Sequence, residues 1–203
     1  MNNQINVPLI LTLHHNLIVN WKSNDIQLTH VGFLKLVEEN HAFNYQLWHA
    51  EDNARRDDLG YEFVYRAKRA IDGFNQQRNN RMELMDAFLF EALSPSVAPT
   101  CIVHSETPGM MIDRLSILAL KIYHMKLQTE RDDVGIEHRE TCLKKYETLL
   151  IQQKQLANCL EQFFLDIKEM KRTFRIYYQL KMYNDPTLNP ALYSAGQVSE
   201  QAS

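Results

Sequence analysis

The stretch LLIQQKQLANCLEQFFLDI, residues 149–167, decides the fold class of this chain. It contains neither glycine nor proline, and its apolar side chains recur mostly at intervals of three, four or seven residues. Such intervals place side chains on one face of an α-helix. The apolar seam continues beyond the stretch and comprises Leu149, Leu156, Leu160, Phe163, Ile167, Met170, Phe174 and Tyr177. The pattern predicts one long helix over 136–183, ended by Pro186, which cannot continue a helix.

The same periodicity predicts helices in the rest of the chain, over about 8–21, 29–56, 60–93 and 106–131. Thr29 and Ser105 are the expected N-caps of the second and fourth of these helices, and Pro108 suits a first helical turn. Short connections between long helices favour antiparallel neighbours. We therefore expect an all-α fold, an up-down-up-down bundle of four long helices plus a short N-terminal helix. It forms a single domain over 1–183, with a flexible C-terminal tail over 184–203.

The composition is that of an ordinary globular protein, with 45% apolar and 23% charged residues. The net charge of −3 argues against a nucleic-acid partner, because such proteins usually carry a basic excess. The cysteines, Cys101, Cys142 and Cys159, lie far apart without zinc-binding spacing, which favours a reducing, cytoplasmic location. No apolar run is long enough to span a membrane. No cofactor motif is present, so we expect no cofactor.

Three of the predicted helices carry a row of polar side chains beside the apolar face. Residues four and seven apart lie on the same side of a helix, because each residue turns the helix by about 100°. The rows are Asn44, Trp48, Glu51 and Arg55; Lys68, Asp72, Asn75 and Asn79, with Arg78 inside the apolar stripe; and Thr107, Arg114 and Lys121. Cations outnumber carboxylates in these rows. If the rows converge, they predict a binding site for an anion.

The carboxylates in and near these rows are the candidate catalytic groups. Glu51 is the first candidate for a general base, followed by Asp72 and Asp52. Glu38 and His41 have the Glu-x-x-His spacing of di-iron bundles, but such centres need two copies of that motif. Moreover, both residues fall away from the predicted core face of their helix. We therefore predict no metal site.

Three stretches together resemble a bacterial family that is catalogued only as a domain of unknown function. They are LWHAEDNARRDD (47–58), KRAIDGFNQQRNNRMELMD (68–86) and SETPGMMIDRLSILALKIYHM (105–125). The resemblance covers about residues 30–180. It implies a helical protein that is often encoded near glycosyltransferases of cell-surface polysaccharide or lipopolysaccharide synthesis, with no established reaction. It points to the same residues as the polar rows and adds Asp113.

The leading hypothesis is a protein that binds an anionic sugar, sugar phosphate or nucleotide sugar between three helices, in support of surface-glycan synthesis. The predicted substrate-binding residues are Trp48, Arg55, Lys68, Asn75, Arg78, Arg114 and Lys121. One alternative is a transferase or hydrolase acting on such substrates, with Glu51 as general base. A second alternative is a scaffold protein that self-associates through helix 136–183 or docks a glycosyltransferase. The scaffold hypothesis predicts polar rows that form internal ion pairs and leave no accessible cavity.

Overall fold

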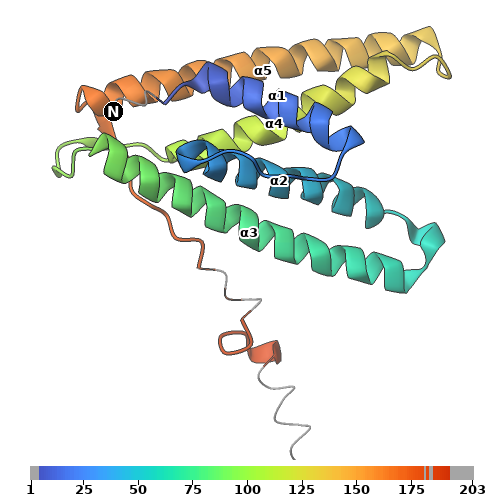
Figure 1. Cartoon of the computed structure of the whole chain (residues 1–203), viewed down its shortest axis with the longest axis horizontal. Helices are drawn as coiled ribbons and strands as arrows, with labels where there is room; N and C mark the ends of the chain where they lie inside the picture. The colour runs from blue at the N-terminus through green and yellow to red at the C-terminus, as the bar shows by residue number, and fades with distance from the viewer. Residues whose placement is uncertain (1–4, 181, 183–184, 193–203) are drawn as a thin grey trace, which may run out of the picture.

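A computed structural model describes residues 5–180, 182 and 185–192 of the protein. Its helices are α1 (Val7–Ser23), α2 (Gly32–Asn53), the short η1 (Asp57–Leu59), α3 (Tyr61–Leu93), α4 (Pro108–Thr129) and α5 (Ile136–Lys168). In Figure 1, α2 with α3 and α4 with α5 form two hairpins, and α1 lies between them. The predicted all-α bundle of four long helices with a shorter N-terminal helix is confirmed.

The start of α4 is fixed by its contact with α3. Thr107, and not the expected Ser105, is the N-cap, since its hydroxyl accepts the Met110 N–H at 3.2 Å. The Gly109 N–H donates to the carboxylate of Asp86 on α3 at 2.7 Å. A Cβ on Gly109 would lie 2.7 Å from that carboxylate, so only glycine allows the two helices to approach this closely.

The start of α2 differs from the prediction. The helix begins at Gly32 rather than at Thr29, and its N-cap residue makes no side-chain cap. The reason is Glu38, whose buried carboxylate accepts the backbone N–H groups of Thr29 at 3.0 Å and His30 at 2.9 Å. These bonds hold the preceding segment across the first turns of the helix instead of within it.

The predicted helix over 136–183 is wrong in its C-terminal part, because α5 ends at Lys168. Met170 adopts a left-handed conformation with φ of 56°. The Met170 N–H then donates to the Ile167 carbonyl and the Lys171 N–H to the Asp166 carbonyl, at 3.0 and 2.8 Å. This is a Schellman C-cap, which satisfies the last carbonyls of a helix. Glycine usually occupies the left-handed position, so the sequence carries no visible stop signal here.

After α5 the chain turns back and completes the core in an extended conformation. The strand β2 (Arg172–Thr173) pairs in parallel with β1 (Ile102–Val103), two short strands that the sequence analysis does not predict. Phe174 follows and is fully buried against Phe90 and Phe163, at ring distances of 5.6 and 6.3 Å. Burial of this ring outweighs the helical pattern of the segment.

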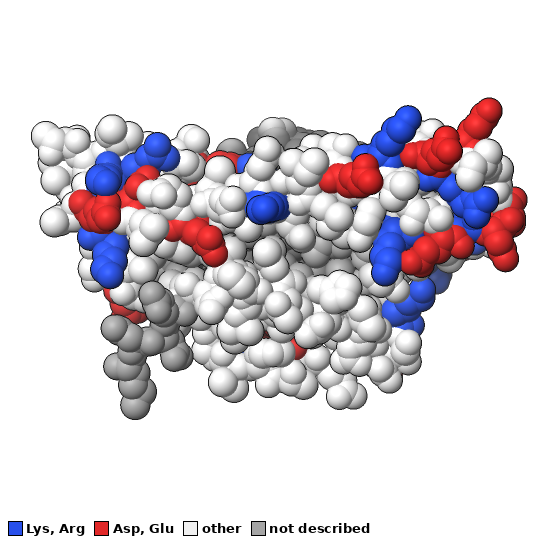
Figure 2. Space-filling view, turned by 90° about the horizontal axis from the view of Figure 1, so that it is seen from above, with Lys and Arg blue, Asp and Glu red and all other residues white. Residues whose placement is uncertain are grey.

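Charged side chains are unevenly distributed over the molecule. Seen from the α5 side, Lys, Arg, Asp and Glu gather toward the two ends and leave the middle, where α1 lies, almost uncharged (Figure 2). The sequence of α1 explains this, because Lys22 is its one charged residue. No helix in the described ranges is long and apolar enough to cross a membrane. Of the predicted tail, residues 185–192 contain a turn capped by Asp185, and the remainder lies outside the described residues.

Candidate functional site

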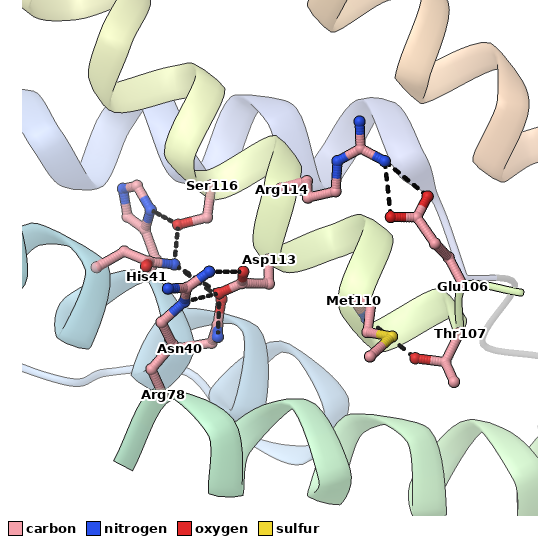
Figure 3. A network of polar contacts seen from close by, with 10 residues as sticks. Asn40, His41, Arg78, Glu106, Thr107, Met110, Asp113, Arg114 and Ser116 are labelled. Carbon is pink, nitrogen blue, oxygen red and sulfur yellow. Dashed lines mark hydrogen bonds and ion pairs between the residues drawn. The ribbon is translucent and has the colours of Figure 1, made fainter. Parts of the chain in front are cut away.

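A buried polar cluster joins α2, α3 and α4 at the centre of the bundle (Figure 3). Its hub is Asp113 on α4, which is almost completely buried. The Asp113 carboxylate accepts hydrogen bonds from the side-chain amides of Asn40 at 3.0 Å and Asn44 at 2.9 Å. Arg78 on α3 donates to both carboxylate oxygens, with its Nε at 2.8 Å. The bidentate pair is therefore supported by two further donors, as a buried ion pair requires.

The cluster continues inward through a serine and two histidines. Ser116 on α4 accepts from the Asn44 amide at 3.0 Å and lies 2.7 Å from His41 Nδ1. The His41 ring stacks on His14 of α1 at 4.5 Å, and both rings are fully buried. Burial lowers the pKa of His14 to about 3 and that of His41 well below its usual value, so both are neutral at pH 7. Glu38 and His41 thus face the interior, contrary to the prediction.

An open groove lies a few turns away, between the C-terminal halves of α2 and α4 and the N-terminal half of α5. Its volume is about 800 Å³, a size that accommodates a small-molecule ligand. It is lined by Trp48, Asp52, Lys121, His124, Met125, Gln128, Lys144, Lys145, Thr148, Leu149 and Gln152. None of the residues of the Asp113 cluster is among them. We call this surface the lysine groove.

The charges of the lysine groove are unbalanced. Lys121 stands on α4, Lys144 and Lys145 stand on α5, and Asp52 is the single carboxylate of the lining. In the described parts of the chain, none of these lysines forms an ion pair with a carboxylate. Unpaired ammonium groups on two neighbouring helices raise the local concentration of anions. The groove is therefore suited to a ligand with negative charge.

One wall of the lysine groove is aromatic. Trp48 on α2 and His124 on α4 stack with ring centroids 4.4 Å apart and planes 6° apart. Burial lowers the pKa of His124, the neighbouring His49 lowers it further, and Asp52 raises it. The buried His124 Nε2 has no hydrogen-bond partner in the described residues, so a second N–H there would remain unsatisfied. His124 is thus a neutral group at pH 7.

The structure brings only some of the predicted site residues together. Trp48 and Lys121 line the lysine groove, and Asp52 lies there with them. Arg78 belongs to the Asp113 cluster, where its guanidinium is already occupied and its pKa is raised by the hydrogen bonds to Asp113. The polar rows therefore converge in part: α2, α3 and α4 meet at Asp113, while the open groove involves α5 in place of α3.

The other predicted residues lie outside both places. They are Glu51 and Arg55, which pair with each other at 2.8 Å; Arg114, which pairs with Glu106; Asp72, which pairs with Arg69; exposed Lys68; and half-buried Asn75. Each of these ion pairs is largely exposed to solvent. Exposed pairs of this kind hold charges in water and contribute little to stability.

Sequence reasoning missed Lys144 and Lys145. Both lie on the polar side of α5, next to the apolar seam that the sequence analysis assigned to scaffold alone. Leu149, the first residue of that seam, also lines the groove. The signal that could have found them is a pair of adjacent lysines one turn before the seam begins, facing the row that contains Lys121.

Comparison with known proteins gives one match. A family model described as "Protein of unknown function (DUF4254)" matches residues 34–176. This range contains the Asp113 cluster apart from His14, and the whole lining of the lysine groove. Neither a curated protein nor a solved structure matches the chain.

Proposed function

The chain belongs to the DUF4254 family, and we propose that it binds an anionic sugar, sugar phosphate or nucleotide sugar in the lysine groove, in support of cell-surface polysaccharide or lipopolysaccharide synthesis. The observation that carries the proposal is the excess of cations in the groove, where three lysines face a single carboxylate. The surface-glycan context comes from the resemblance given above.

The groove supplies a complete set of contacts for such a ligand. Lys121 on one wall and Lys144 with Lys145 on the other hold phosphate or carboxylate oxygens between them. The amides of Gln128 and Gln152 offer hydrogen bonds to hydroxyl groups, and the Gln128 carbonyl oxygen is already taken by Arg131 at 3.1 Å. Met125 and Leu149 provide apolar surface for the face of a ring. The aromatic wall of Trp48 adds a rigid edge.

The residues proposed here to contact the anion differ from those predicted from the sequence. Lys121 keeps the predicted role, and Lys144 with Lys145 replace Arg55, Arg78 and Arg114, whose guanidinium groups already have carboxylate partners. A ligand would have to break those pairs before it could use them. The lysines of the groove need no such exchange.

A thermal-shift screen of the full chain tests the proposal. The panel contains inorganic phosphate, sugar phosphates, free nucleotides and nucleotide sugars, each with and without Mg²⁺. A ligand present at about 100 times its dissociation constant stabilises the protein by about 2.7 kcal/mol, which is readily measured. We expect Lys144→Ala and Lys145→Ala to weaken binding about tenfold or more, because each removes a charged hydrogen-bond donor.

Lys154→Ala is the matched control, since Lys154 is an exposed lysine of the same helix outside the groove. The proposal predicts that this variant shifts like the unaltered protein. Absence of a shift with every compound, or equal loss of binding in Lys154→Ala, would contradict it.

The enzymatic alternative is favoured by a separate observation. The carboxylate of Asp52 and the imidazole of His124 lie in the same groove as the lysines, whereas Glu51 lies outside its lining. A transferase or hydrolase would therefore use Asp52, and not Glu51, as general base. With a ligand from the screen in hand, Asp52→Asn should abolish turnover and leave binding intact. Glu51→Gln should leave both unchanged.

A further inference from the structure

A second hollow lies between α2 and α3, near the closed end of their hairpin (Figure 1). Its volume is about 350 Å³, at the lower end of the range for small-molecule sites. It is lined by Ile26, Tyr45, Gln46, His49, Ala50, Asn53, Ala67, Ala70 and Phe74. None of these residues lines the lysine groove. We call this hollow the hairpin pocket.

The sequence explains why the two helices leave space here. Ala50 on α2 and Ala67 with Ala70 on α3 contribute only a methyl group each to the lining. Ile26, from the segment between α1 and α2, provides a further wall. A few residues later that segment is fixed to Glu38 by backbone hydrogen bonds. The pocket therefore follows from small residues at the helix contact and from a connecting segment that is held in place.

Four polar side chains of the hairpin pocket have no polar partner. Gln46 and Asn53 each bring an amide, and their spacing of seven residues places both on the same side of α2. Tyr45 adds a hydroxyl and His49 an imidazole, and the two rings meet edge to face with centroids 4.6 Å apart. Within the part of the chain that the structure describes, none of these four side chains makes a hydrogen bond or an ion pair. Their donors and acceptors remain available to a ligand.

The lining determines which ligand chemistry fits. It contains no Lys, Arg, Asp or Glu, and five of its nine residues are apolar. A charged ligand would lose hydration there without gaining a partner of opposite charge. A sugar carries hydroxyl groups around its whole ring, whereas a nucleobase buries two flat faces and forms hydrogen bonds through its edge. The amides of Asn and Gln match such an edge, because each presents a donor beside an acceptor.

We propose that the hairpin pocket binds the uncharged base of a nucleoside. The amides of Gln46 and Asn53 bond the edge of the base, while Phe74 and the three alanines cover its faces. The site is separate from the lysine groove, and the proposal does not rest on the function proposed above.

Isothermal titration calorimetry of the full chain with adenosine, guanosine, cytidine and uridine tests the proposal. A nucleoside carries no phosphate, so its binding is distinct from anion binding in the lysine groove. We expect at least one nucleoside to bind and Gln46→Ala to weaken that binding about tenfold, because the variant lacks the hydrogen bonds to the base. Gln77→Ala is the matched control, since Gln77 is an exposed glutamine of α3 outside the pocket, and it should bind normally. Absence of binding with all four nucleosides, or equal weakening in both variants, would overturn the proposal.

A second variant fills the pocket. Ala70→Trp places an indole in the hollow and should abolish nucleoside binding, and because Ala70 is exposed, the larger side chain does not displace the core. Ala87→Trp makes the same change at an exposed alanine of α3 outside the lining and should leave binding unaltered. Circular dichroism identifies any loss of fold. A folded Ala70→Trp that binds nucleosides as tightly as the unaltered protein would refute the proposal. Binding of glucose without binding of any nucleoside would assign the pocket to a sugar and would refute it equally.

Discussion

The Asp113 cluster and the lysine groove both use helices α2 and α4. They differ in whether their charged side chains have partners of opposite charge. In the cluster, Arg78 faces Asp113, and two asparagine amides complete the shell of that carboxylate. In the groove, three lysines share one carboxylate and form no ion pair within the described residues. In the cluster Asp113 is buried and Arg78 is mostly buried, whereas the groove is open to solvent.

The difference separates a polar site whose groups already have partners from a groove whose cations have none within the described residues. A buried ion pair is stable only when each of its donors and acceptors has a hydrogen-bond partner. No donor or acceptor then remains to bind a ligand. Cations on an open surface remain solvated at little cost, and they are free to exchange water for an anion. The scaffold hypothesis expected internal ion pairs and no cavity. The molecule has both internal ion pairs and an open groove, so neither of these two features excludes the other hypothesis.

Removing the hub of the cluster should have the largest effect on stability. Asp113→Ala leaves the Arg78 guanidinium and the amides of Asn40 and Asn44 without their common acceptor. We expect a loss of about 3 kcal/mol in the free energy of unfolding, measured by urea denaturation, because the Arg78 charge, whose side chain is only 25% exposed, loses its partner. Asp58→Ala is the control. It breaks the exposed pair with Arg56 and should not change stability measurably.

A small effect of Asp113→Ala would break the comparison, since it would mean that water enters the cluster and solvates Arg78. The cluster would then resemble the groove, and Arg78 would regain the predicted role of an anion ligand. Asp113→Asn distinguishes these cases further. It keeps one acceptor oxygen but removes the charge, so it should retain part of the stability if hydrogen bonding and charge both contribute.

The helical faces could be predicted from the sequence, because periodicity reports which side of a helix meets the core. Trp48, Arg78 and Lys121 were found in this way, and each does border the interior or the groove. What periodicity does not report is the partner across the interface. Whether Arg78 meets a ligand or Asp113 depends on the rotation and tilt of three helices, which one sequence does not contain.

Two other failures have the same origin. The end of α5 is set by burial of Phe174 against Phe90 and Phe163, a contact between distant parts of the chain. Locally, residues 169–177 keep the helical period and lack a glycine or proline. Lys144 and Lys145 line the groove only because α5 packs beside α4. In each case tertiary contacts override or reinterpret a correct local pattern.

Lowering the pH should reduce the free energy of unfolding by less than Asp113→Ala does, through the buried histidines of the cluster. His14 has a folded-state pKa of about 3 and an ordinary unfolded-state value near 6.5, so the unfolded state binds more protons as pH falls below 6.5. Between pH 7 and 5.5 His14 costs about 1.3 kcal/mol, and His41, whose pKa burial also lowers, changes stability in the same direction. Asp86 acts in the opposite sense, because burial raises its pKa to about 6 and the folded state takes up its proton. That offsets about 0.8 kcal/mol, so His14 and Asp86 together leave a net loss of about 0.5 kcal/mol, which His41 increases.

Urea denaturation at both pH values measures this loss. His14→Gln should remove the contribution of His14, about 1.3 kcal/mol between pH 7 and 5.5, whatever its effect on stability at pH 7. His15→Gln is the matched control, because His15 is the exposed neighbour on the same helix, and it should keep the full dependence. An unchanged slope in His14→Gln would show that the buried ring does not remain neutral. The cluster would then contain a charge without a partner, and the contrast with the groove would fail.

The smallest effect on stability is expected in the groove itself, where it is most informative. Lys121→Ala should change the free energy of unfolding by less than about 0.5 kcal/mol, because Lys121 is exposed and has no ion pair in the described residues. It should nevertheless abolish the thermal shift caused by an anionic ligand. Arg114→Ala is the sharpest comparison, since sequence reasoning gave both residues the same role and Arg114 pairs with Glu106 at 2.6 Å. If Arg114→Ala also loses the shift, the ligand draws Arg114 away from Glu106, and a surface ion pair would have to be counted as part of the binding site.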